Sequence, residues 1–163
     1  MTIFDILNQV QNYVLRLTQN PSVAEDILQE TYLRWLTNQK SGKNTVPAEK
    51  IRAWIYRTAR NLAMDYFRQK KKSKDGEAGW FERALARGIA DGPETTVERK
   101  EEMEHLLKQL ERLPAKHQEA VRLKFQERLS YDEIAEVLGE PRTTVAWILH
   151  EAVCKLRKAM GAV

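Results

Sequence analysis

The richest chemistry in this chain lies in residues 50–74, a stretch with nine basic residues and a single acidic one. An α-helix through it would place Arg57, Asn61 and Arg68 on one face, with Arg60 at the edge. Arginine and lysine neutralise phosphates, and an asparagine amide can pair with the edge of a base. The face therefore has the composition of a nucleic-acid binding surface, and the lysine-rich end of the stretch favours a polyanion partner.

Aromatic residues add a second kind of chemistry to this helix. Trp54, Tyr56 and Phe67 fall at angles between the basic face and the predicted core. Aromatic rings stack on unpaired bases, at about 1–3 kcal/mol per base. We expect a helix over about 49–72 that binds single-stranded or opened DNA, and the alternative is a solvated basic face with aromatic residues at a domain edge. The predicted buried stripe consists of Ile51, Ile55, Thr58, Leu62 and Tyr66.

A second unusual surface belongs to the preceding helix, which we expect to open at Pro21 and Ser22. The predicted core positions of this helix are Ala24, Leu28, Thr31, Tyr32 and Trp35. Its opposite face sets Leu33 among polar residues, namely Asp26, Gln29 and Glu30. This pattern fits either a surface that docks another protein or a solvated face with one exposed leucine.

The C-terminal part of the chain has the pattern of a helix-turn-helix. Ser130 is placed to cap one helix, Gly139 and Pro141 break it, and a second helix follows. Its predicted buried positions are Val145, Ile148, Leu149, Ala152 and Leu156. In such motifs the second helix enters the major groove of DNA, although a structural helical hairpin would show a similar pattern.

Helical spacing elsewhere and the absence of a convincing period of two predict an all-α protein. Residues 73–94 hold four of the seven glycines and are expected to form a flexible linker. The sequence therefore predicts two small helical domains, 1–72 and 95–163, the second containing the helix-turn-helix.

Composition argues against an enzyme, a metalloprotein and a membrane protein. His105, His117 and His150 are far apart along the predicted helices, and the one cysteine, Cys154, is expected to pack inertly near a buried stripe. We therefore expect no catalytic residue, metal, cofactor or small-molecule substrate. No apolar run approaches the roughly 20 residues of a membrane span, and no secretory signal is visible, so a cytoplasmic protein is expected.

Three stretches resemble the extracytoplasmic-function sigma factors, the minimal class of bacterial RNA polymerase specificity subunit. NPSVAEDILQETYLRW is similar to the first helical motif of that family, and IRAWIYRTARNLAMDYFRQKKK to its promoter-melting helix. LPAKHQEAVRLKFQERLSYDEIAEVLGEP is similar to its C-terminal domain. The resemblance covers most of the chain outside the predicted linker.

The resemblance implies roles for the two N-terminal surfaces. The first motif of the family docks on the β′ clamp helices of core RNA polymerase, whose β subunit is a further partner. The residues that this role would fall on are Asp26, Gln29, Glu30, Leu33 and Arg34. The second motif captures a flipped base of the −10 element with the asparagine of an ARN triplet, which corresponds to Asn61. The melting and −10 residues would be Trp54, Arg57, Arg60, Asn61 and Arg68.

The C-terminal motif departs from the family where it would contact the −35 element. Ala146, Trp147 and Ile148 replace the usual basic run, and Glu151 stands where an arginine is usual. The remaining candidates for −35 contacts are Arg142, Thr143, Thr144, Trp147 and His150. A similar apolar version of this helix occurs in the iron-starvation branch of the family, whose pattern is matched by Glu151, Ala152, Arg157 and Lys158.

The resemblance thus implies a promoter-specificity factor that binds core polymerase and promoter DNA, assists melting and is held inactive by an anti-sigma protein. Two other functions remain open at this point. One is a stand-alone helix-turn-helix regulator, which leaves the Leu33 surface without a purpose. The other is a sigma-like adaptor that sequesters an anti-sigma protein, which fits the charge-poor recognition helix.

Overall fold

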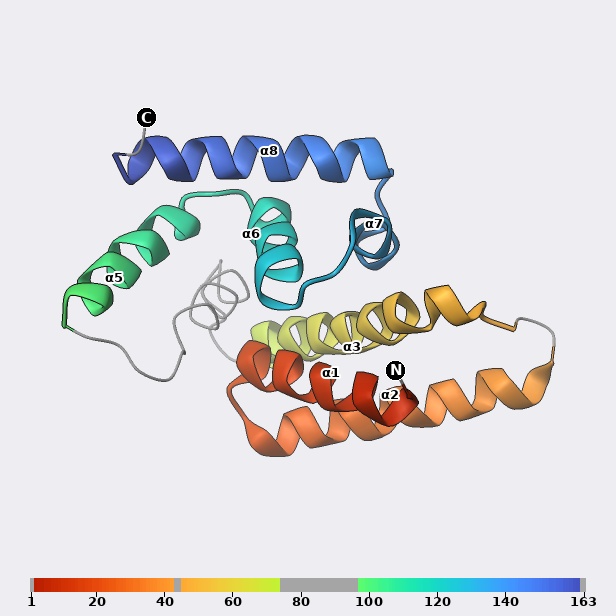
Figure 1. The fold of residues 1–163 in the computed structure, drawn as a ribbon. Coiled ribbons are helices and arrows are strands. Elements are labelled where there is room, and N and C mark those ends of the chain that lie inside the picture. Colours follow the sequence, from red (N-terminus) through yellow and green to blue (C-terminus); the bar gives the residue numbers. More distant parts are fainter. Residues whose placement is uncertain (1, 43–44, 74–96, 162–163) are drawn as a thin grey trace. The chain divides into compact units, whose positions relative to one another are not determined.

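The computed structural model describes residues 2–42, 45–73 and 97–161, and these residues contain helices and no strand. The chain divides into two compact units, Met1–Trp80 and Phe81–Val163 (Figure 1). The prediction of an all-α fold with two helical parts is confirmed. The predicted linker 73–94 lies outside the described residues, apart from Ser73.

The first unit contains α1 (Ile3–Thr18), α2 (Pro21–Ser41), a single 3-10 turn η1 (Ala48–Lys50) and α3 (Ile51–Ser73). All three α-helices contact one another (Figure 1). The helix α2 begins where the sequence predicted, because Pro21 occupies its first turn and the Asn20 side chain accepts hydrogen bonds from the backbone N–H groups of Ser22 and Val23. The α1 and α2 core residues are Ile6, Leu7, Val10, Tyr13, Val14, Leu17, Ala24, Ile27 and Trp35.

The buried face of α3 differs from the predicted stripe. Of that stripe, only Ile55 is fully buried, and the other members are partly exposed. The buried residues of the described part of α3 are Ala53, Ile55, Tyr56, Ala59, Ala63 and Phe67. Most of them stand one residue after a predicted position, which turns the helix by about 100°. The small alanines allow a neighbouring helix to come close, and the large residues before them lie on the flank.

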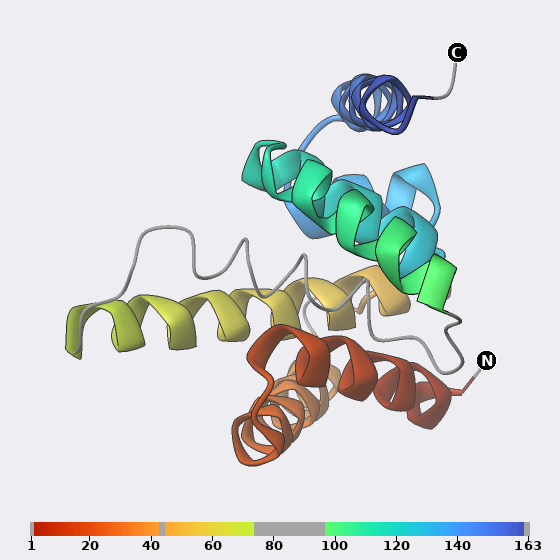
Figure 2. The same cartoon turned by 90° about the vertical axis from the view of Figure 1, so that its left-hand side faces the viewer.

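The second unit contains α5 (Val97–Glu111), α6 (Ala115–Val121), the π-helical turn η2 (Arg122–Gln126), α7 (Tyr131–Leu138) and α8 (Arg142–Ala159). The helices α5, α6 and α7 all contact α8. Figure 2 looks almost along α8 and shows these three helices on one side of it. The predicted core positions Val145, Ile148, Leu149 and Ala152 are buried on that side.

The predicted helix-turn-helix forms through its local signals. The Ser130 side chain accepts a hydrogen bond from the Glu133 N–H, and the Glu133 carboxylate accepts one from the Ser130 N–H, which is a capping box. At the other end of α7, Gly139 adopts φ = 67°, a left-handed conformation that favours glycine. The helix α8 then begins directly after Pro141.

We expect Ser130→Ala to lower the free energy of unfolding by about 1 kcal/mol, because the backbone N–H of Glu133 loses the side-chain oxygen that accepts its hydrogen bond. Urea denaturation followed by circular dichroism measures this change. The control Ser130→Thr keeps a capping hydroxyl and should lie close to wild type. Equal losses in the two variants would mean that the cap does not stabilise α7.

No helix in residues 2–42, 45–73 or 97–161 combines the length and the apolar character that crossing a membrane requires.

Candidate functional site

The exposed side of α2 carries the first candidate surface, which we name the Leu33 face and define as Asp26, Gln29, Glu30, Leu33 and Arg34. All five side chains are exposed, and Leu33 is 56% exposed at the centre of this polar group. Arg34 donates a hydrogen bond from Nε to Glu30 Oε1 at 3.1 Å, which links the carboxylate to the next turn. An exposed pair of this type adds little stability, so the arrangement is available for a partner.

The sequence analysis missed an apolar extension beside this face. Phe4 of α1 is exposed and its ring lies 6.5 Å from that of Tyr32 on α2. Leu36, one turn beyond Leu33, is also partly exposed. The contact between Phe4 and Tyr32 joins α1 to α2 and depends on tertiary packing, so helical spacing within α2 could not predict it.

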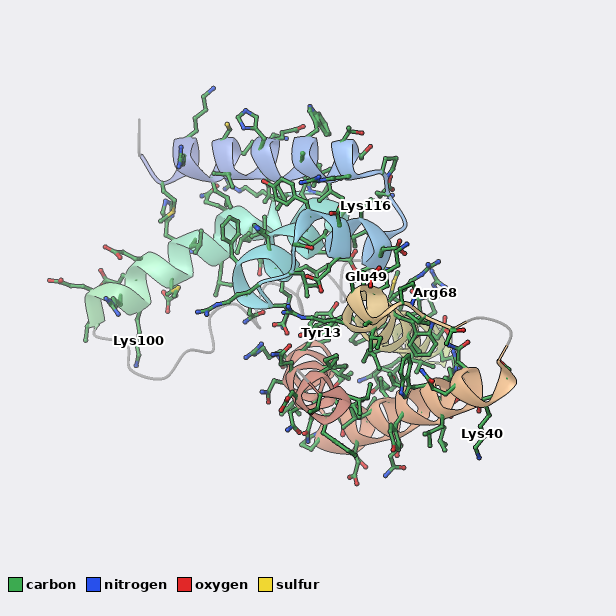
Figure 3. All side chains as sticks on the ribbon, turned by 45° about the vertical axis from the view of Figure 1, so that its right-hand side comes forward. Tyr13, Lys40, Glu49, Arg68, Lys100 and Lys116 are labelled. Atoms are coloured by element: carbon green, nitrogen blue, oxygen red, sulfur yellow. The ribbon has the colours of Figure 1, made fainter. Side chains whose placement is uncertain are left out.

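The second candidate surface lies on α3, and we name it the Asn61 face, consisting of Arg57, Arg60, Asn61 and Arg68. Arg57, Asn61 and Arg68 are exposed and Arg60 is half-buried, as their helical angles predicted. Arg60 donates a hydrogen bond from Nη1 to Asn61 Oδ1 at 3.4 Å, which leaves the amide N–H₂ of Asn61 directed elsewhere. Arg68 lies 3.5 Å from Asp65 and projects from α3 in Figure 3.

The prediction that aromatic rings interleave with this basic face is wrong for two of the three residues. Tyr56 is 1% exposed and packs at 5.3 Å from the ring of Tyr13, and Phe67 is also buried. Their burial follows from the one-residue rotation of α3. Trp54 remains partly exposed, and its ring packs edge-on against that of Trp35, with the ring centres 5.5 Å apart. Of the three predicted aromatic residues, Trp54 is therefore the one that lies beside the Asn61 face.

The third candidate surface is the outer side of α8. Arg142, Thr143, Trp147 and His150 are exposed, and Thr144 is half-buried. Cys154 is also exposed on this side, and its Sγ lies 3.6 Å from His150 Nε2. Inert packing of Cys154 is therefore wrong, because a position two residues after the buried Ala152 lies almost opposite to it around the helix.

The middle of α8 carries no positive charge, but basic residues gather beside α7. Lys124 Nζ lies 5.0 Å and Arg142 Cζ 6.0 Å from the centre of the Tyr131 ring, and Arg142 Nε also lies 3.5 Å from Asp132. Exposed Arg128 belongs to the loop that precedes α7. The sequence analysis did not select Lys124, Arg128 or Tyr131, and the basic residues just before the capping serine were the available signal.

Glu151 connects α8 to α6. A hydrogen bond from Lys155 Nζ at 2.8 Å lowers the pKa of the Glu151 carboxyl, with partial burial opposing this effect. The charge of Lys155 lowers that pKa further, and His117 of α6, 3.8 Å away, adds to the same effect. Glu151 is therefore an anion at neutral pH that is paired with Lys155 of its own helix and lies next to His117 of α6.

Comparisons with known proteins show which family the chain resembles. Two family models match the chain: Sigma-70 region 2 over residues 5–73 and Sigma-70, region 4 over residues 109–158. The RNA polymerase sigma factor YlaC of Bacillus subtilis (strain 168) is 31% identical over 152 residues, which cover 93% of this chain and 86% of that protein. The ECF RNA polymerase sigma factor SigW of the same organism is 31% identical over 159 residues, covering 94% and 83%.

A solved structure has a similar fold. It is the sigma factor RpoE from Bartonella quintana in complex with the anti-sigma factor NepR, with a TM-score of 0.58 over 98% of this chain and 94% of that one, at 20% identity. The chain belongs to the extracytoplasmic-function sigma factors of RNA polymerase. It is accordingly a promoter-specificity subunit that acts in transcription initiation.

Proposed function

We propose that the Leu33 face binds the β′ clamp helices of core RNA polymerase. The observation that carries this proposal is a large apolar side chain, 56% exposed, encircled by carboxylates, an amide and a guanidinium. Protein interfaces commonly have such an apolar centre with a polar rim. Carboxylates such as Asp26 and Glu30 fit a partner surface that carries basic residues.

We propose that the Asn61 face recognises and opens the −10 element. Arg57, Arg60 and Arg68 neutralise phosphates, and the Asn61 amide binds the edge of an extruded base. Extruding a base costs a few kcal/mol, which cationic contacts and a pocket offset. Trp54 is the one ring of the predicted aromatic set with an exposed part beside this face, so we assign base stacking to it rather than to Tyr56 or Phe67.

We propose that α7 and α8 contact the −35 element. The candidate contacts on α8 are Arg142, Thr143, Thr144, Trp147 and His150. The cations around Tyr131 supply phosphate contacts that the middle of α8 lacks, since the first helix of a helix-turn-helix crosses the DNA backbone. The proposed domains are 1–72, which docks on polymerase and binds the −10 element, and 95–163, which binds the −35 element. The linker 73–94 joins them, so that binding of one domain raises the effective concentration of the other on the promoter.

We propose that an anti-sigma protein regulates this chain, and that the chain acts in the cytoplasm, where RNA polymerase works. The similar sigma factor RpoE was solved with its anti-sigma factor NepR, which supports this proposal. We place the chain in the iron-starvation branch on the pattern of Glu151, Ala152, Arg157 and Lys158, of which Ala152 is buried and the two cations are exposed. A target promoter without an iron-uptake or surface-signalling gene downstream would contradict this placement.

The proposed function is tested by transcription from DNA templates randomised across the −35 and −10 regions. We expect transcripts only when the full chain and sigma-free core polymerase are both present, with two enriched elements at a fixed spacing. Sequence-specific binding by the chain without core would favour the stand-alone regulator. Binding to an anti-sigma protein without any transcription would favour the adaptor.

A further inference from the structure

The outer side of α8 offers DNA a large apolar side chain. Trp147 is 60% exposed in the second turn of α8, and its exposed neighbours on this side are Thr143 and His150. Within the second unit, α5, α6 and α7 all lie on the other side of α8 (Figures 1 and 2). The indole therefore projects mainly from the side of α8 that faces away from these helices, although the ring of His117 from α6 reaches one of its edges.

The part of α8 that carries this indole has no positive charge. Residues 143–154 of α8 contain no arginine or lysine. Arg142, at the start of the helix, lies 3.5 Å from Asp132 and against the Tyr131 ring, and Lys155 is held by Glu151 at 2.8 Å. A guanine is normally read in the major groove by a bidentate arginine or a lysine. The middle of α8 has neither side chain to read it.

The Trp147 ring has an aromatic contact within its own unit. His117 of α6 is buried, and its ring meets the indole edge-on, with the ring centres 6.0 Å apart and the planes at 77°. An aromatic group that is fixed before binding loses little conformational entropy when it meets its target. The contact with His117 thus restricts the indole on one side, and the exposed remainder of the Trp147 ring is an apolar surface.

We infer that Trp147 reads the C5 methyl group of a thymine in the −35 element. The thymine methyl is the apolar group that base pairs display in the major groove, and apolar side chains recognise it by contact. The inference rests on the proposed function, because it requires α8 to enter that groove. The inference predicts an A·T base pair in the −35 element at the position that faces Trp147.

Deoxyuridine, which differs from thymidine only by the missing methyl group, tests this contact. Holoenzyme made from the full chain and core polymerase first selects its −35 element from a randomised library. Each thymine of the selected element is then replaced in turn, and duplex binding is measured. We expect one replacement to weaken wild-type binding about four-fold, the effect of one methyl group. The same replacement should hardly weaken duplex binding by the Trp147→Ala variant. For Trp147→Phe, it should weaken binding by less than it does for wild type.

Phe125→Ala is the matched control, because Phe125 is 62% exposed in the same unit but lies in η2. It should keep the wild-type deoxyuridine profile, and circular dichroism should show wild-type helicity for all variants. A selected −35 element without thymine, or equal deoxyuridine costs in wild type and Trp147→Ala, would overturn the inference and leave the proposed function intact. Failure of the chain to form holoenzyme would instead remove the proposed function and the inference together.

Discussion

Replacing Leu33 with aspartate should weaken binding to core RNA polymerase by about a hundred-fold. The variant removes an apolar group from the centre of the proposed interface and puts a charge there that docking would strip of water. Because Leu33 is already exposed in the free protein, the substitution should leave the fold unchanged. Fluorescence anisotropy of labelled chain titrated with core polymerase measures the affinity.

Leu15→Asp is the matched control, since Leu15 is an exposed leucine of α1 in the same unit. It should bind core polymerase like wild type. Glu30→Lys, which reverses one charge of the Leu33 face, should give an intermediate loss that shrinks at high salt. Wild-type affinity in Leu33→Asp would refute the assignment of this face.

Asn61→Ala should reduce open-complex formation by about ten- to a hundred-fold while core binding stays at the wild-type level. The amide contact would be made only after a base leaves the stack, so its loss raises the free energy of the opened state and not of the closed one. A good amide–base contact contributes roughly 1–3 kcal/mol, and its loss corresponds to the expected reduction in open-complex formation. Fluorescence of 2-aminopurine placed in the −10 region of a transcribed promoter reports opening.

The exposed Asn12 of α1 provides the control substitution Asn12→Ala, which should open DNA normally. A second test uses a template with an abasic site at each −10 position in turn. At the position that Asn61 reads, the abasic site should impair wild type and cause no further loss in Asn61→Ala. Additive losses at every position would show that Asn61 acts without contacting a base.

The two helices of the helix-turn-helix could be predicted because their signals are local. The capping box at Ser130 and the left-handed Gly139 are set by neighbouring residues, and the apolar spacing of α8 is regular. The exposure of Leu33 could also be predicted, since α2 has polar residues on both sides of it. In these cases the helical angle alone decides which side faces the core.

The orientation of α3 could not be read from its large apolar residues. Its buried side includes Ala53, Ala59 and Ala63, and small residues give a weak hydrophobic signal although they permit close helix packing. Tyr56 and Phe67 consequently turn inward, and the predicted aromatic surface is reduced to Trp54. The exposure of Arg57, Asn61 and Arg68 was predicted correctly because charged and amide groups are costly to bury and so mark the solvent side.

Contacts between distant segments could not be predicted from the sequence. Lys124 and Arg142 meet at the Tyr131 ring from different elements, and His117 of α6 meets Trp147 of α8. Helical periodicity describes a single element and carries no information about which ring or cation a second element brings to it. The support of the Trp147 ring by His117 was therefore a finding of the structure.

The central claim is that this chain works through RNA polymerase, and size-exclusion chromatography with sigma-free core polymerase tests it most directly. We predict that the wild-type chain co-elutes with core as a stable complex and that Leu33→Asp elutes alone. The contradicting result is elution of the wild-type chain by itself from a core preparation that still binds another sigma factor.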